Sequence, residues 1–237
     1  MKEMKGFTLV ELTIAIGVTA LLMAAVYMAV NSAQRHSSGI ERKVTAQQDV
    51  KPALDLMAME IGMASYNPTL RVVWVNPTGT CLGTATNQNY RGIQEATDNS
   101  LAVEMDISGY TSATGSIDGD GMLGDENEVI RYSYDTANQY IARATSCGTA
   151  QPFLGETATS GRPRVLVIND TLGLPIFRYF DGTGTEIAST ALPAAIPNIR
   201  RVDITLAVET EYNDATTGRK RRLIYSTSVI PRNHAIN

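Results

Sequence analysis

Residue types that usually build enzyme and metal centres are scarce in this sequence. Its 237 residues include two histidines, His36 and His234, and two cysteines, Cys81 and Cys147. The cysteines are far apart and form no CxxC pair, which argues against a zinc site. Neither histidine has a plausible catalytic nucleophile or metal partner in the local sequence. We therefore predict no catalytic centre and do not expect an enzyme.

The sequence also lacks an excess of basic charge. The formal net charge is −4 and the isoelectric point is about 5.3, whereas a nucleic-acid-binding domain is usually basic. One basic string, GRKRR at 218–222, contains Arg219, Lys220, Arg221 and Arg222. Such a string can contact DNA or an acidic partner, but a solvated hairpin turn is the simpler interpretation. Nucleic acid is therefore not expected among the partners.

A long apolar run opens the chain. Residues 7–30 contain a single charged residue, Glu11, and a helix of that length, roughly 36 Å, can cross a bilayer. Lys2 and Lys5 precede the run and favour a cytoplasmic N-terminus, so that the rest of the chain emerges on the far side. The run continues into the protein without the small-residue cleavage site of a secretory signal. A plain membrane anchor is one interpretation.

Glu11 points beyond a plain anchor. A carboxylate inside an apolar span costs about 3 kcal/mol and usually has a function. Its natural partner is a cation, and one candidate is the amino group that a cut just before Phe7 would create, one helical turn away. When apolar helices pack side by side, that amino group could belong to a neighbouring copy. The charge pair would then favour one axial register between subunits.

The string KGFTLVELTIAIGV at 5–18 resembles the type IV prepilin signature. That signature has a basic leader ending in glycine, then Phe, Thr, Leu, a hydrophobic residue, Glu and a long apolar helix. The resemblance implies that a prepilin peptidase cuts between Gly6 and Phe7 and methylates the new amino group of Phe7. It also implies that Glu11, the fifth residue of the mature chain, recruits subunits and sets their register.

The helix continues past the apolar run with a different pattern. Four apolar residues spaced by four, three and four share one helical face: Val50, Leu54, Met57 and Ile61. Gly39 weakens the helix locally, and Pro52 is expected to kink it or to begin a new helix. We predict a leader at 1–6, a membrane-spanning or filament-core helix at 7–30, its amphipathic second half at 31–63 and a globular β-rich domain at 64–237.

The rest of the chain reads as strands and turns. Apolar alternation predicts strands at 70–75, 100–107, 128–134, 140–144, 164–168, 176–180, 200–210 and 223–230. The last two form an antiparallel hairpin with a polar turn. A helix followed by antiparallel strands defines an α+β class. With the prepilin signature, this implies the type IV pilin fold, in which a long N-terminal helix packs on a C-terminal antiparallel β-sheet domain.

Two further stretches refine the resemblance. QQDVKPALDLMAMEIGMASYNP at 47–68, and the ending from IRRVDITLAVET to YSTSVIPRN, resemble PilW-type minor pilins and J-type pseudopilins of type II secretion. The resemblance implies a minor pilin in a priming or tip complex, with a secretion pseudopilin or a tip adhesin or DNA-binding pilin as alternatives. Its implied partners are other minor and major pilins, the prepilin peptidase and an inner-membrane assembly platform. Before assembly the chain would be a single-pass inner-membrane protein with a periplasmic domain, and afterwards part of a surface pilus or a periplasmic pseudopilus.

The segment SIDGDGMLGDENEV at 116–129 crowds carboxylates between glycines: Asp118, Asp120, Asp125 and Glu128. Ca²⁺ needs six to eight oxygens on a flexible backbone. One register starts at Asp118 and adds the carbonyl of Met122. The other starts at Ser116 and resembles an EF-hand loop, but has Asn127 where a bidentate Glu is usual. The alternatives are a calcium site and a polar hairpin turn.

The two cysteines present a similar choice. In a periplasmic or extracellular domain, a Cys81–Cys147 disulfide is expected and would close a long loop. The alternative is two buried free thiols.

Overall fold

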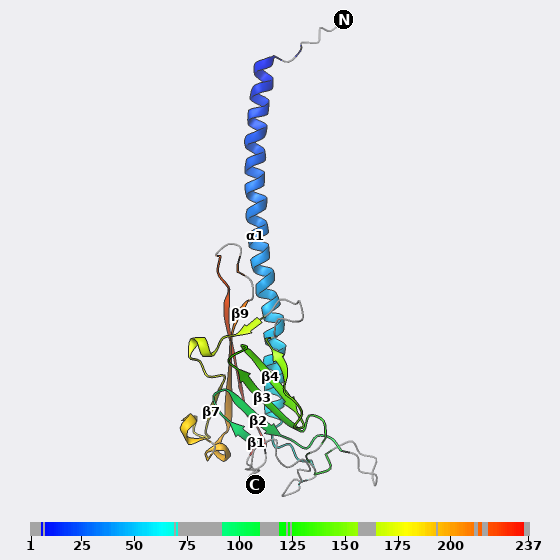
Figure 1. The fold of residues 1–237 in the computed structure, drawn as a ribbon, viewed down its shortest axis with the longest axis vertical. Coiled ribbons are helices and arrows are strands. Elements are labelled where there is room, and N and C mark those ends of the chain that lie inside the picture. The colour runs from blue at the N-terminus through cyan, green and yellow to red at the C-terminus, as the bar shows by residue number, and fades with distance from the viewer. Residues whose placement is uncertain are drawn as a thin grey trace.

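One helix, α1 (Leu9–Gly62), dominates the fold. The computed structural model describes Gly6, residues 8–68, Leu70 and residues 92–109, 119–121, 123, 125–155, 165–192, 194–210, 213–214 and 218–234, with no side-chain description for Arg42. α1 is a rod that carries the β-rich part at its C-terminal end and stands bare towards its N-terminal end (Figure 1). The α+β class predicted from the sequence is confirmed, and the arrangement is consistent with a type IV pilin fold.

The helix is unbroken over 54 residues. Pro52 lies inside it without ending it. The proline ring removes one helical N–H, which would have bonded the carbonyl of Gln48. Gln48 and Pro52 are both exposed, so water can replace the missing donor. At the end of the helix, the Met63 N–H bonds to the carbonyls of Met59 at 3.1 Å and Glu60 at 3.2 Å.

The two halves of α1 have different surroundings. Large apolar side chains from Leu9 to Val30 are exposed on every side. Among the described residues, α1 is the one helix long and apolar enough to cross a membrane, and none of its most apolar stretch is buried. The second half buries a single stripe, which confirms the predicted face and extends it in both directions: Ala46, Val50, Ala53, Leu54, Met57, Ile61 and Ala64. Each large side chain in this stripe contributes about 2 kcal/mol by leaving water.

The strands form two antiparallel sheets. The first is a meander of β1 (Ile93–Ala96), β2 (Ser100–Glu104), β3 (Val129–Asp135), β4 (Tyr140–Thr145) and β5 (Gln151–Leu154). The second has the order β10 (Arg222–Val229), β9 (Arg201–Thr210), β7 (Phe177–Phe180) and β8 (Glu186–Ile187), with β6 (Val165–Val167) also paired to β9. Short 3₁₀ helices lie in the connections: η1 (Asp170–Leu172), η2 (Ser189–Ala191) and η3 (Ile196–Asn198).

Most predicted strands are present, with shifts at their ends. The strand expected at 100–107 ends at Glu104, where the chain turns into an irregular loop. The strand expected at 70–75 lies outside the described residues except for Leu70. β1, β5 and β8 were not predicted, because these two to four residues do not belong to a longer apolar run. β6 and β7 are as short, but they lie within the apolar runs at 164–168 and 176–180.

The core lies where α1 meets both sheets. α1 packs on β9 and β10 of the second sheet and contacts β5 of the first. Its stripe shares one cluster with fully buried side chains from both sheets, including Leu101, Tyr132, Phe177, Tyr179 and Ile204. The helix is therefore fixed to the β-rich part over its second half, and any displacement of the sheets would uncover the stripe.

A buried polar network joins α1 to the first sheet. Glu60, only 4% exposed, accepts hydrogen bonds from the Tyr132 hydroxyl of β3 and from Arg143 of β4. Arg143 Nη2 lies 2.5 Å from Glu60 Oε1 and 3.1 Å from Asn127 Oδ1. Burial, and then the hydrogen bond to Glu60 and its charge, raise the pKa of Tyr132 well above its ordinary value. Tyr132 is therefore neutral at physiological pH and serves as a donor.

Glu60→Ala should lower the free energy of unfolding by about 3 kcal/mol, because it leaves the Arg143 guanidinium without its counter-charge. Urea unfolding of the purified protein measures the change. The matched control replaces both Glu60 and Arg143 by Met, which removes both charges and should recover most of the loss. A double variant no more stable than Glu60→Ala would show that the unpaired charge is not the cause.

Candidate functional site

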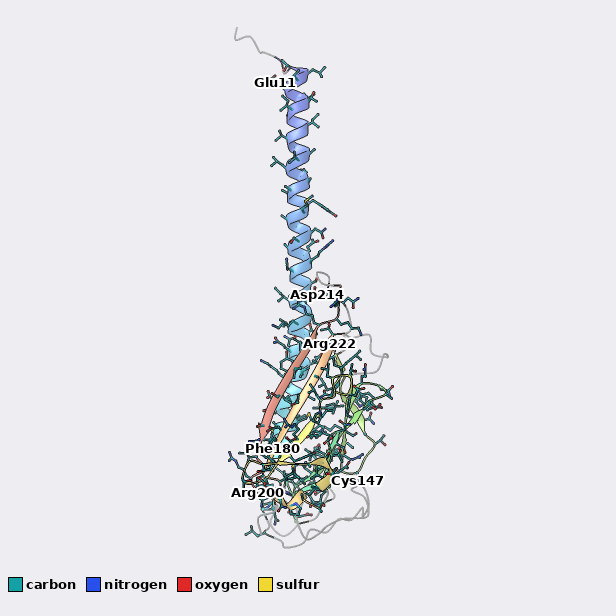
Figure 2. The ribbon with its side chains drawn as sticks, turned by 90° about the vertical axis from the view of Figure 1, so that its left-hand side faces the viewer. Glu11, Cys147, Phe180, Arg200, Asp214 and Arg222 are labelled. Carbon is teal, nitrogen blue, oxygen red and sulfur yellow. The ribbon has the colours of Figure 1, made fainter. Side chains whose placement is uncertain are left out.

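The bare end of α1 carries Glu11, the residue singled out by the sequence (Figure 2). Gly6 is exposed, and Phe7, the other side of the expected cleavage site, lies outside the described residues. Thr8 caps the helix, since its Oγ1 accepts the Glu11 N–H at 3.2 Å. In return, Glu11 Oε2 accepts the Thr8 N–H at 2.9 Å and the Thr8 hydroxyl at 2.9 Å. This capping box gives the carboxylate two donors from its own chain.

The capping box was missed by the sequence analysis, although the spacing Thr-x-x-Glu before an apolar run is its signal. Two donors from the same chain reduce the cost of a carboxylate in an apolar setting. Glu11 can therefore be carried by a single subunit and still present an exposed side chain to a neighbour. The apolar side chains that follow it need either lipid or other helices to cover them.

Asp214 and Arg221, in the described part of the connection between β9 and β10 that we call the hairpin tip, lie against α1 at Gly39 (Figure 2). Asp214 is 1% exposed, and Arg221 Nε lies 2.5 Å from its Oδ2. Gly39 is buried beneath this pair, because a Cβ there would lie 3.0 Å from Asp214 Oδ2 and 3.3 Å from Arg221 Nη2. The sequence indicated only a weak point at Gly39. The structure shows a close approach that a missing side chain permits.

The basic string at 218–222 is largely neutralised by the hairpin itself. Arg222 Nε lies 3.0 Å and Lys220 Nζ lies 3.6 Å from the two carboxylate oxygens of Glu209. Arg221 pairs with Asp214. At least three of the four cations therefore have a carboxylate partner on the same hairpin, which favours the solvated turn over a surface for DNA.

The acidic loop is organised mainly by backbone donors. Asp118 and Met122 lie outside the described residues. Glu128 is fully buried: its Oε1 accepts the N–H groups of Ile107 at 3.2 Å and Ser108 at 3.1 Å, and its Oε2 accepts that of Asp125 at 3.0 Å. Among the described residues, no group of three or more metal-binding side chains comes together. The predicted Ca²⁺ site at Asp118, Asp120, Met122, Asp125 and Glu128 therefore stays a prediction.

A further carboxylate, Asp106, belongs to this loop and was not predicted. It is fully buried, and its Oδ2 accepts the Gly121 N–H at 2.9 Å. Gly119 packs so closely on Asp106 that a side chain would not fit. Gly109 has φ +146°, and a Cβ there would lie 2.6 Å from Asp120 Cβ. Gly109 and Gly119 therefore serve close packing, whether or not a cation binds.

The cysteines and histidines of the described chain are structural or solvent-exposed. No free cysteine occurs among the described residues, and Cys147 follows β4. Cys81 lies outside them, so the Cys81–Cys147 disulfide stays a prediction. His36 is exposed on α1. His234 is fully buried: its Nδ1 accepts the Ile93 N–H at 3.1 Å, so its Nε2 donates to the Ile196 carbonyl at 2.8 Å. It links the C-terminal turn to β1 of the first sheet and to η3.

Comparison with known families identifies the N-terminal segment. Residues 1–27 match the family described as the prokaryotic N-terminal methylation motif. The match includes Gly6, Phe7 and Glu11, so the chain carries a prepilin-type signal. Comparisons with curated proteins and with solved structures give no match.

Gly39→Val should lift the hairpin tip from α1, because the added methyl groups collide with Asp214 and Arg221. We expect faster hydrogen exchange at the Thr210 and Asp214 amides, which bond to the carbonyls of Arg221 and Arg219. The opposing gain in helix propensity is only about 0.5 kcal/mol. Ser37→Val, at an exposed position two residues away, is the matched control. Unchanged exchange in the Gly39 variant would exclude the close packing.

Glu128→Gln should lower the melting temperature even in the presence of chelator, because an amide nitrogen cannot accept the backbone N–H groups that Glu128 holds. The expected cost is about 1–3 kcal/mol. If the loop binds Ca²⁺, the cation raises the melting temperature of the unmodified protein, and Asp120→Asn removes that rise. If the melting curves of the unmodified protein in calcium and in chelator are the same, the loop is a polar turn and not a calcium site.

Proposed function

We propose that this chain is a minor pilin, a subunit of a priming or tip complex in type IV pilus assembly. One observation carries the proposal. A prepilin-type signal at 1–27 leads directly into a helix whose first half is apolar and uncovered, while the second half of the same helix holds a β-rich domain. Such a subunit must exchange one apolar environment for another when it leaves the membrane.

The proposed sequence of events follows from the N-terminal geometry. The peptidase cuts between Gly6 and Phe7 and methylates the new amino group. The apolar half of α1 then moves from lipid into a bundle of similar helices, driven by an assembly platform in the inner membrane. Glu11, which accepts hydrogen bonds from Thr8 of its own chain, meets the amino group of a neighbouring subunit and sets the register. The β-rich domain lies in the periplasm before assembly.

The alternative function, a minor pseudopilin of a type II secretion system, is supported by the same two features. The prepilin-type signal and the long helix are common to both machines, so the location of the mature chain decides between them. A DNA-binding or adhesive role has less support, because the cations at 218–222 are paired within the hairpin.

The mass and N-terminal sequence of the protein, from native membranes and from sheared surface fibres, test the proposal. We expect a chain that begins at N-methylated Phe7 and is present in the fibres. Mature protein confined to the envelope, with loss of exoprotein secretion in a deletion strain whose pili are intact, would establish the pseudopilin instead. A chain that still begins at Met1, where the peptidase is active, would contradict both.

Glu11→Ala should leave cleavage intact and reduce incorporation into fibres on the order of tenfold, since an intersubunit charge pair contributes at least about 1.4 kcal/mol. Quantitative immunoblots of fibre and membrane fractions measure the ratio. Thr13→Ala, also exposed near the start of α1, is the matched control. Normal incorporation of the Glu11 variant would remove the assembly role.

A further inference from the structure

Apart from the three-residue β6, which pairs with β9, the two sheets have four outer strands, and three of these are protected against pairing with another chain. β8 has two residues. β5 has four, including Pro152, and its pairing with β4 has a register shift. β1 also has a register shift, contacts η3, and gives its Ile93 N–H to His234. Short strands, proline, irregular register and coverage are the usual means of blocking an exposed sheet edge.

The fourth outer strand, β10, has none of these protections among the described residues. It pairs with β9 over eight residues in continuous register, without a bulge or a proline. Thr210 N–H donates to Arg221 O at 2.9 Å. Because antiparallel strands alternate the direction of their backbone groups, the N–H groups of Ile224, Ser226 and Ser228 point away from β9. Among the described residues no strand lies on this side of β10, so these groups form an edge that can bond to another strand.

The same strand exposes large apolar side chains. Ile224 on β10 is 58% exposed, and Ile230 just after it is 63% exposed. Six residues of extended chain place them about 20 Å apart. Ser226 and Ser228 lie between them on the same side and are also exposed. An unprotected edge with an apolar residue at each end has the chemistry of a site for an extended peptide segment.

The orientation of β10 restricts which chain can supply that segment. β10 lies beside α1, with Val229 Cγ1 3.7 Å from the position of a Cβ on Gly62. Both run from the bare end of α1 towards the far end of the β-rich part, so β10 is nearly parallel to the helix (Figure 2). Two copies that paired β10 with β10 in the common antiparallel mode would point their helices in opposite directions. Subunits anchored in one membrane cannot do so.

We propose that the β10 edge binds an extended segment of a different pilin-type subunit whose N-terminal helix runs parallel to α1. The segment adds a strand to the second sheet and places apolar side chains next to Ile224 and Ile230. This inference rests on the proposed function, because it is assembly that brings parallel subunits together. It adds a contact in the β-rich domain to the contacts that the apolar helices make.

Photo-cross-linking in the full-length protein, expressed in cells that assemble the fibre or pseudopilus, tests the inference. p-Benzoylphenylalanine replaces Ile224, and the matched control replaces Leu172, which is 36% exposed and belongs to η1. We expect an adduct from position 224 alone, with a second chain whose peptides identify it as a subunit carrying its own N-terminal methylation motif. No adduct above that of the control, or an adduct of this chain with itself, would overturn the proposal.

A backbone variant separates strand pairing from simple proximity. Ser226→Pro removes an N–H that points to the free edge, and proline is tolerated at such edge positions. We expect the adduct from position 224 to fall roughly tenfold, since a neighbouring backbone group then loses its partner. Ser226→Ala should leave the adduct unchanged. Equal adduct yields in the Pro and Ala variants, at matched melting temperatures, would exclude β-pairing.

The location of the unmodified chain keeps this test separate from that of the proposed function. Mature protein in fibres or pseudopili without a specific adduct at position 224 overturns the edge contact and leaves the assembly role standing. Absence of the mature protein from both structures overturns the assembly role itself.

Discussion

The structure depends on one helix whose two halves need different surroundings: an apolar environment around the first half and the β-rich domain on one face of the second half. Over its first half α1 is apolar on every side, and over its second half it buries a single stripe from Ala46 to Ala64. The burial of that stripe against β9, β10 and β5 holds both sheets in place. Because the helix is continuous, the direction of the bare half is fixed by the packing of the other half. Gly39 extends the contact between α1 and the β-rich part beyond the stripe, because its missing side chain lets the hairpin tip pack on the helix.

Features that repeat along the chain were predictable, and features made by distant residues were not. The stripe on α1 and the alternation in β9 and β10 are local patterns, so the spacing of apolar residues was enough to predict them. The network of Glu60, Tyr132 and Arg143 joins residues up to 83 positions apart. No local sequence pattern predicts it. Gly39 is similar, since its role depends on Asp214 from a different part of the fold.

The candidate site divides in the same way. The N-terminal signal is contiguous, so Gly6, Phe7 and Glu11 could be identified directly from the sequence. The capping pair of Thr8 and Glu11 is contiguous too, but its spacing was overlooked. In the acidic loop the spacing of carboxylates suggested calcium ligands, but the burial of Glu128 and its backbone hydrogen bonds depend on the chain at 107–108. Carboxylates that bind metals and carboxylates that hold loops use the same oxygen atoms. Sequence spacing alone cannot distinguish them.

The parallel course of β10 and α1 has a mechanical consequence. A pull along the axis of α1 acts along the strands of the β9–β10 hairpin and not across them. The hydrogen bonds between these strands, which pair eight residues of β10 with β9, are then loaded in shear and share the force, whereas a pull across the strands would open them one pair at a time. The fold is therefore built to bear tension in the direction of its own helix.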